Sequence, residues 1–156
     1  YFLLNSKLVS YLLARGIEAT RSYVEIFLYN DFSHHYADWI FGRGWFGAYY
    51  DPIYNKFRSS IETGYLALIL RGGYLYLIPY VAILLLSFFN GYFKSNNLFC
   101  KSFGILCLMQ VVSLYPWGWP QFNFFHYFVW LGVWICNNRT YRMMNDDQVN
   151  QKVFKQ

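Results

Sequence analysis

The sequence predicts an all-α fold, a fragment of a polytopic transmembrane helical bundle with about three membrane spans and an outer amphipathic helical loop. Two features of composition favour this class. Charged residues make up only 13% of the chain, whereas an ordinary soluble domain carries about a quarter. Aromatic residues make up 24%, and tyrosine and tryptophan gather at the headgroup depth of a bilayer.

The third feature is a series of three apolar runs in the second half of the chain. Residues 64–89 contain one charge, Arg71, and are long enough to cross a hydrocarbon core, which needs about 20 residues. Residues 98–115 and 121–137 are shorter and rich in aromatic side chains. The segments that join these runs predict tight turns between antiparallel transmembrane helices.

The placement of basic residues predicts the orientation. One end of the predicted spans carries several basic residues, namely Lys94, Lys101 and those of the tail, 138–156. The "YPWGWPQ" turn at the other end has no charge. The positive-inside rule therefore puts the tail in the cytoplasm. We expect the polar residues after Asn145 to be loosely ordered. Residues 1–4 are apolar and follow no initiator Met or basic leader, which predicts the end of a span truncated from a larger protein.

Residues 5–63 then form the outward-facing segment. Apolar residues at helical spacing predict two short amphipathic helices against the membrane surface between Asn5 and Asn30. Ser22 and Glu25 have the spacing of a capping box at a helix start. Residues 31–60 predict an irregular loop with glycine turns.

Arginines and glycines gather where the outward segment meets the first span. The planar guanidinium groups of Arg21 and Arg43 suit phosphate oxygens. Gly42 and Gly44 flank Arg43 and would let backbone N–H groups approach an anion. These residues predict an anion-binding site on the outer side.

The entrance of the first span adds two further candidates. Glu62 lies at the expected boundary of water and lipid, where partial desolvation would make it a stronger general base. Arg71 lies about 13 Å deeper along the helix. A charge at that depth is costly, which predicts that Arg71 faces a cavity or a bound group. Gly72 and Gly73 beside it could break the helix.

Structural interpretations of the same residues remain open. Arg21 and Glu25 could form an i,i+4 surface pair. Lys56 and Arg58 could contact lipid headgroups. Glu62 could be an N-terminal helix residue that the helix dipole favours.

Other suggestive residues predict no further site. Adjacent histidines in a loop, such as His34 and His35, seldom bind one ion, so we expect no metal. His126 and the three cysteines lie in or beside apolar runs and are interpreted as packing residues. The net charge of +5 forms no basic stripe, so we expect no nucleic acid partner.

Three stretches together resemble a known family: "TRSYVEIF", "DWIFGRGWFGAYY" and "IETGYLALILRGGYLYLIPY". They are similar to the C-terminal part of bacterial O-antigen and capsular polysaccharide polymerases, which share a superfamily with the O-antigen ligases. The resemblance covers about residues 5–135. The ligases carry His-Asn at the entrance of the following span, where this chain has Glu62 and Thr63, so the polymerases are the better match.

The resemblance implies a multi-pass protein of the bacterial inner membrane that acts on its periplasmic face. The implied substrate is an undecaprenyl-pyrophosphate-linked oligosaccharide in the membrane lipid, polymerised into O-antigen, lipopolysaccharide, capsule or exopolysaccharide without a cofactor. A chain-length regulator protein is an implied partner. The family's periplasmic arginines bind the pyrophosphate, and the matching positions are Arg21 and Arg43.

The resulting hypothesis is a membrane glycosyltransferase. Arg21 and Arg43 bind the pyrophosphate, Glu62 takes the proton from an acceptor sugar hydroxyl, and Arg71 keeps Glu62 ionised or binds a lipid phosphate. The alternatives are a polysaccharide transporter or flippase with a polar pathway along Arg71 and His126, an O-antigen ligase, and a non-catalytic scaffold.

Overall fold

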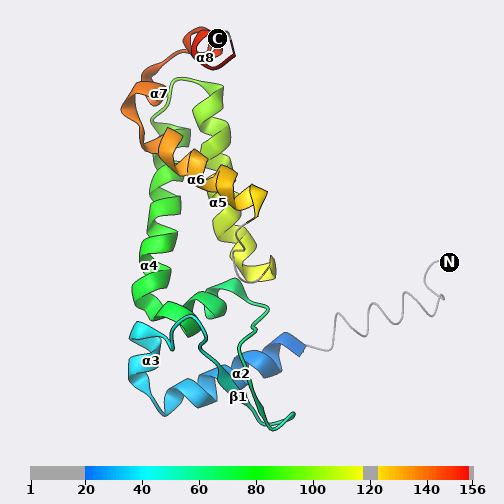
Figure 1. Ribbon diagram of the computed structural model, residues 1–156. Coiled ribbons are helices and arrows are strands. Elements are labelled where there is room, and N and C mark those ends of the chain that lie inside the picture. Colours follow the sequence, from blue (N-terminus) through cyan, green and yellow to red (C-terminus); the bar gives the residue numbers. More distant parts are fainter. Residues whose placement is uncertain (1–19, 118–122, 155–156) are drawn as a thin grey trace, which may run out of the picture.

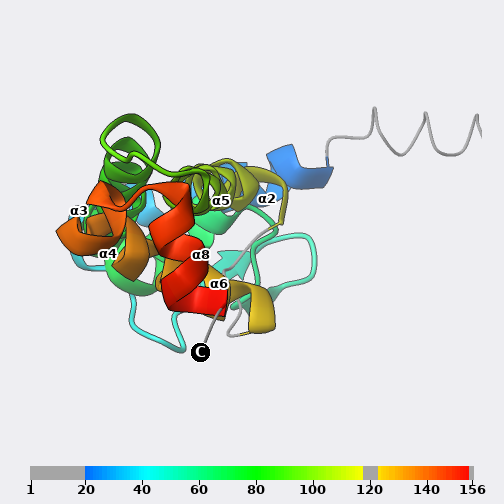
Figure 2. The ribbon, with the colours of Figure 1, turned by 90° about the horizontal axis from the view of Figure 1, so that it is seen from above.

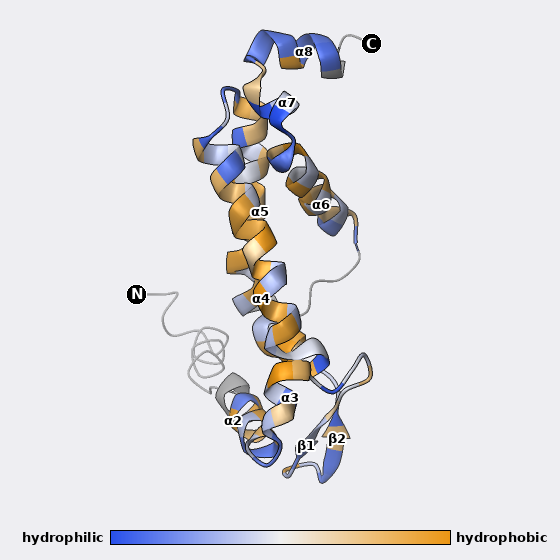
Figure 3. Cartoon of the chain, turned by 90° about the vertical axis from the view of Figure 1, so that its left-hand side faces the viewer, coloured by the Kyte–Doolittle hydropathy of each residue, from blue (hydrophilic) through white to orange (hydrophobic). Residues whose placement is uncertain are grey.

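The computed structural model describes residues 20–117 and 123–154, and the predicted span end at residues 1–4 lies outside them. The described part is mostly helical and elongated (Figure 1). Its centre is formed by α4 (Gly64–Phe93), α5 (Leu98–Trp117) and α6 (Phe124–Asn137). The two ends are more hydrophilic than this centre (Figure 3).

The three central helices agree closely with the three predicted apolar segments. Within the described residues, α4 and α5 are long and apolar enough to cross a membrane. The third helix, α6, has 14 residues and is about 21 Å long, which is shorter than a hydrocarbon core of about 30 Å. Two of the three predicted spans are therefore confirmed as helices of sufficient length, and the third is not.

Many large apolar side chains on these helices are exposed. They include Leu75, Ile78, Leu86, Met109, Val112, Phe124, Tyr127 and Trp134. The helices bury their other faces against one another, with Leu84, Cys107, Leu114 and Val129 in the shared core. All three cysteines are buried and free, as a packing role requires.

The helix α4 is broken at Gly73, as the adjacent glycines predicted. Gly73 has φ 63° and ψ −167°, a region that only glycine occupies readily. A Cβ at this position would lie 2.1 Å from the carbonyl oxygen of Ile40. The predicted single span at 64–89 is therefore two helical segments that meet at a close backbone contact.

The first segment of α4 belongs to the core of a subdomain, residues 24–72, which we call the outer subdomain after its predicted side of the membrane. Its side chains pack with α2 (Thr20–Ser33) and with the strand β1 (Tyr49–Asp51). The buried residues of this core are Leu28, Phe32, Tyr49, Ile61, Leu66, Ala67, Ile69 and Leu70. Residues 64–70 are thus largely covered by protein, which the sequence did not indicate.

The outward segment differs from its prediction in three respects. Ser22 lies inside α2, so the predicted capping box is wrong. The region expected to be an irregular loop contains α3 (Tyr36–Phe41) and an antiparallel hairpin of β1 with β2 (Lys56–Arg58). The fold is therefore not purely α. Strands of three residues are too short to give a clear alternating pattern.

The tail is helical. It forms α7 (Arg139–Met143) and α8 (Asp146–Phe154), which lie over the end of the bundle (Figure 2). The part after Asn145, which we expected to be loosely ordered, is docked: Asp146 Oδ1 accepts from the Leu98 N–H at 2.8 Å, and Val149 is buried. Asn97 is buried and its Nδ2 donates to the carbonyl oxygens of Tyr141 at 2.8 Å and Met144 at 2.9 Å. Its Oδ1 accepts from the Cys100 N–H at 2.8 Å and so caps α5.

The break in α4 generates a stability prediction. Gly73→Ala introduces both backbone strain and the clash with Ile40, so we expect a loss of about 3 kcal/mol or more in the free energy of unfolding. The measurement is denaturant unfolding of the purified protein in detergent micelles.

Gly44→Ala is the matched control. Gly44 also has a positive φ of 80°, but a Cβ there meets nothing within 4 Å, so the expected loss is about 1 kcal/mol. Equal losses for the two variants would show that α3 does not pack on the break.

Candidate functional site

The Gly42–Gly44 turn caps the broken end of the first α4 segment. Because α4 is interrupted at Gly73, its preceding carbonyl groups lack partners in their own helix. The Arg43 N–H donates to the Leu70 carbonyl at 2.7 Å, and the Gly44 N–H donates to the Arg71 carbonyl at 2.9 Å. The turn therefore closes the helix with main-chain hydrogen bonds.

This arrangement corrects the predicted role of Gly42 and Gly44. The Gly42 N–H donates to the Asp38 carbonyl at 2.8 Å, so all three N–H groups of the turn are bound within the protein. They are not directed at an anion. Gly42 is instead required for close approach, since a Cβ there would lie 2.5 Å from the carbonyl carbon of Arg71.

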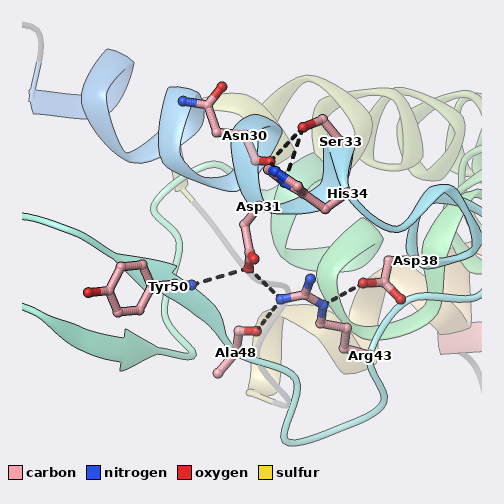
Figure 4. A network of polar contacts seen from close by, with 8 residues as sticks. All are labelled: Asn30, Asp31, Ser33, His34, Asp38, Arg43, Ala48 and Tyr50. Atoms are coloured by element: carbon pink, nitrogen blue, oxygen red, sulfur yellow. Dashed lines mark hydrogen bonds and ion pairs between the residues drawn. The ribbon is translucent and has the colours of Figure 1, made fainter.

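Arg43 lies between two carboxylates (Figure 4). Its Nε donates to Asp38 Oδ2 at 2.7 Å, and its Nη1 donates to Asp31 Oδ2 at 2.5 Å and to the Ala48 carbonyl at 2.8 Å. The guanidinium carbon also lies 4.7 Å from the ring centroid of Phe32. Arg43 thus links α2, α3 and the loop before β1.

The charges around Arg43 bear on its predicted role as a pyrophosphate ligand. One guanidinium beside two carboxylates leaves a local charge of about −1, which repels a pyrophosphate. The contacts give Arg43 a structural role instead. The sequence did not identify Asp31 and Asp38 as partners of this arginine.

Arg71 lies at the helix break itself. Its guanidinium carbon is 5.3 Å from the ring centroid of Trp45, a distance typical of a cation–π contact. The Arg71 side chain is half-buried, and Trp45 and Phe46 of the adjoining loop are exposed. The structure thus places a cation and exposed aromatic rings where the outer subdomain joins the apolar helices.

Glu62 lies just before α4 and is exposed. The protein itself does not bury this side chain, so the partial desolvation expected of it is not present within the chain. Burial raises the pKa of the Tyr49 phenol, Arg58 opposes that rise, and the carboxylates of Asp51 and Glu62 add to it. Glu62 is therefore within electrostatic reach of the Tyr49 hydroxyl.

A second carboxylate lies next to this position. Thr63 is buried, and its Oγ1 donates to Glu25 Oε1 at 2.8 Å. Glu25 thus binds the residue beside Glu62 rather than its own helix start. This contact has no local sequence signal, because it joins residues 38 positions apart.

Arg58 is bound to the protein rather than free for lipid headgroups. Its Nη1 donates at 2.9 Å to Asp51 Oδ2, and Asp51 Oδ1 accepts from the N–H groups of Ile53 and Tyr54. Burial alone would raise the pKa of Asp51, but these hydrogen bonds outweigh burial, so the pKa lies below its ordinary value. This ion pair fixes the base of the hairpin.

The structure brings together only some of the predicted site residues. Gly42, Arg43 and Gly44 meet the main chain of Arg71 at the helix break. Glu62 lies at the other end of the same helical segment, about 13 Å away along its axis. The side chain of Arg21 lies outside the described residues.

His126 agrees with its interpretation as a packing residue. It is buried in α6, and its Nε2 accepts a hydrogen bond from Trp130 Nε1 at 2.8 Å. The Asn123 side chain caps the same helix by accepting from the His126 N–H at 3.0 Å.

Comparison of the chain with protein-family models, with curated proteins and with solved structures found no match. The resemblance to polysaccharide polymerases therefore depends on the residues quoted above.

The Arg43 contacts generate a charge-rescue prediction. Arg43→Gln leaves Asp31 and Asp38 without their cation, and we expect a loss of about 2–3 kcal/mol in the free energy of unfolding. Adding Asp38→Asn to this variant removes one unpaired carboxylate and should restore about 1 kcal/mol. Denaturant unfolding in micelles measures both effects. A stable Arg43→Gln variant that has lost only activity would instead assign Arg43 to ligand binding.

Proposed function

We propose that this chain forms part of a membrane glycosyltransferase of the bacterial inner membrane. It polymerises undecaprenyl-pyrophosphate-linked oligosaccharide units into O-antigen, capsular or exopolysaccharide on the periplasmic face. The resemblance quoted above motivates the substrate class, and the arrangement of apolar and charged residues supports the membrane setting.

Exposed apolar helices support insertion into a membrane. The core helices of a soluble protein bury most of their side chains, whereas only 22% of the most apolar stretch of α4 and 28% of that of α5 is buried. Lipid is the solvent that such faces suit. The basic residues Lys94, Lys101, Arg139, Arg142 and Lys152 all lie at the α7–α8 end. This distribution favours a cytoplasmic position for that end.

One observation carries the proposal: the cationic side chain of Arg71 lies beside the break at Gly73 in an apolar helix. Arg71 follows a run of apolar residues. The main-chain carbonyl group of Arg71 accepts a hydrogen bond from the Gly44 N–H of the Gly42–Gly44 turn. Trp45 covers one face of its guanidinium. A planar donor at the junction of polar subdomain and apolar helices suits a lipid-linked pyrophosphate. Arg71 replaces Arg43 as the principal candidate for this role.

The chemistry assigned to the site is a single displacement. An acceptor sugar hydroxyl loses its proton to the Glu62 carboxylate and attacks the anomeric carbon of the donor. The bond between that carbon and the pyrophosphate oxygen breaks, and undecaprenyl pyrophosphate leaves with the electron pair. Arg71 stabilises the charge on the leaving group. Attack from the opposite face inverts the anomeric centre.

The test uses a polymerase-null host that expresses the full-length protein. We expect Arg71→Ala and Glu62→Gln to lower polymer yield about 100-fold or more and to leave single repeat units. Arg139→Ala, at the opposite end, is the matched control and should give normal polymer ladders. Normal ladders at normal expression would remove the altered residue from the mechanism.

Reconstitution with lipid-linked repeat units separates the alternatives. Chain growth supports the polymerase. Movement of the units across the bilayer without growth would identify a transporter, and neither outcome would identify a scaffold. Transfer to a lipid A acceptor without chain growth would identify a ligase.

A further inference from the structure

The β1–β2 hairpin presents a set of aromatic side chains to solvent. Tyr50 and Phe57 are cross-strand partners on its outer face, with ring centroids 5.7 Å apart in an edge-to-face arrangement. Phe57 is 72% exposed, and Ile53 and Tyr54 in the turn are 65% and 64% exposed. Single exposed apolar residues are normal, but three exposed rings on one small hairpin are typical of a binding surface.

The hairpin holds these side chains in fixed positions. The buried Asp51 accepts from Arg58 and from two N–H groups of the turn. The Tyr50 hydroxyl donates to Asn55 Oδ1 at 2.5 Å. Lys56 Nζ and the Arg58 guanidinium carbon lie 5.1 Å and 5.8 Å from the Tyr54 ring centroid. A surface with this preorganisation loses little conformational entropy when it binds.

The position of the hairpin argues against a bilayer as its occupant. The hairpin lies at a hydrophilic end of the molecule, away from the apolar lengths of α4 and α5 (Figure 3). Its surface also combines rings with polar groups, namely the Tyr54 hydroxyl and the Lys56 ammonium. A sugar ring has an apolar C–H face and a rim of hydroxyl groups, so it matches both kinds of group.

The hairpin is continuous with the candidate catalytic position. The strand β2 ends at Arg58, and Glu62 follows four residues later. The Tyr49 hydroxyl of β1 donates to the Ser60 carbonyl at 3.5 Å, two residues before Glu62. A saccharide chain that lies across the hairpin would therefore extend toward the carboxylate that acts on its terminal hydroxyl.

We propose that the aromatic hairpin surface, formed by the rings of Tyr50, Tyr54 and Phe57, binds an oligosaccharide chain during polymerisation. This inference rests on the proposed function. The Phe57 and Tyr54 rings stack on sugar faces, and the surface retains the polymer between successive additions. Retention raises the number of units added before release, so the hairpin sets product length without taking part in bond formation.

The first test measures polymer length in the polymerase-null host with the full-length protein. Phe57→Ser and Tyr54→Ser each remove a stacking ring, and we expect the modal ladder length to fall about twofold or more while short products persist. Phe57→Trp keeps an aromatic ring and should restore the length. Ile53→Ser removes an apolar side chain of similar exposure that has no ring, and its ladders should match those of the wild type.

The second test measures binding directly. The full-length protein in lipid nanodiscs is titrated with lipid-free polymer of several repeat units released from the same host. We expect Phe57→Ser to weaken binding about three- to tenfold, and Phe57→Trp and Ile53→Ser to change it less than twofold. Equal melting temperatures of the four proteins in nanodiscs establish that the hairpin change is local.

The outcomes separate the two proposals. If Phe57→Ser gave ladders as long as those of the wild type and bound the polymer as tightly, the hairpin inference would be overturned and the polymerase proposal would stand. Equal shortening by Ile53→Ser and Phe57→Ser would identify an apolar contact with a protein or a second copy of the chain, which also overturns the inference. An absence of chain growth in the wild type would overturn the proposed function itself.

Discussion

The structure depends on the contact between the Gly42–Gly44 turn and the break in α4. Two main-chain hydrogen bonds join the turn to the carbonyl groups of Leu70 and Arg71. Gly42 and Gly73 allow this contact, because a Cβ at either position would overlap a neighbouring backbone. Carbonyl groups at a broken helix end are costly when they lack a hydrogen-bond donor, and the turn removes that cost. The same contact fixes the outer subdomain on the apolar helices.

This contact also separates two arginines that look alike in the sequence. Arg43 points into the outer subdomain, where Asp31 and Asp38 neutralise it. Arg71 lies at the junction, where the Trp45 ring is its aromatic neighbour. The net negative charge beside Arg43 repels a phosphate. The positions of the carboxylates therefore disfavour Arg43 as a ligand of an anionic lipid, which the density of arginine in the sequence does not reveal.

Local features were predictable from the sequence, and long-range contacts were not. Long apolar runs predicted α4, α5 and α6, and the adjacent Gly72 and Gly73 predicted the break, because both signals are local. The hairpin was missed because its strands have only three residues each. The docked tail depends on Asn97, whose partners lie 44 and 47 residues away. The partner of Thr63 lies 38 residues away. Asp31 and Asp38 are nearer to Arg43 in sequence, but the turn that brings them to its guanidinium group has no local sequence signal.

Site-directed accessibility labelling of the full-length protein in intact cells tests the central claim most directly. Its native cysteines within the described residues are buried, so single cysteines at the exposed Ser59 and Asn150 report on the two ends. If the outer subdomain lies outside the cytoplasm on membrane-spanning helices, a membrane-impermeant maleimide labels Ser59→Cys in intact cells and labels Asn150→Cys only after lysis. Labelling of both positions from the same side, or of Ser59→Cys only after lysis, would contradict the account.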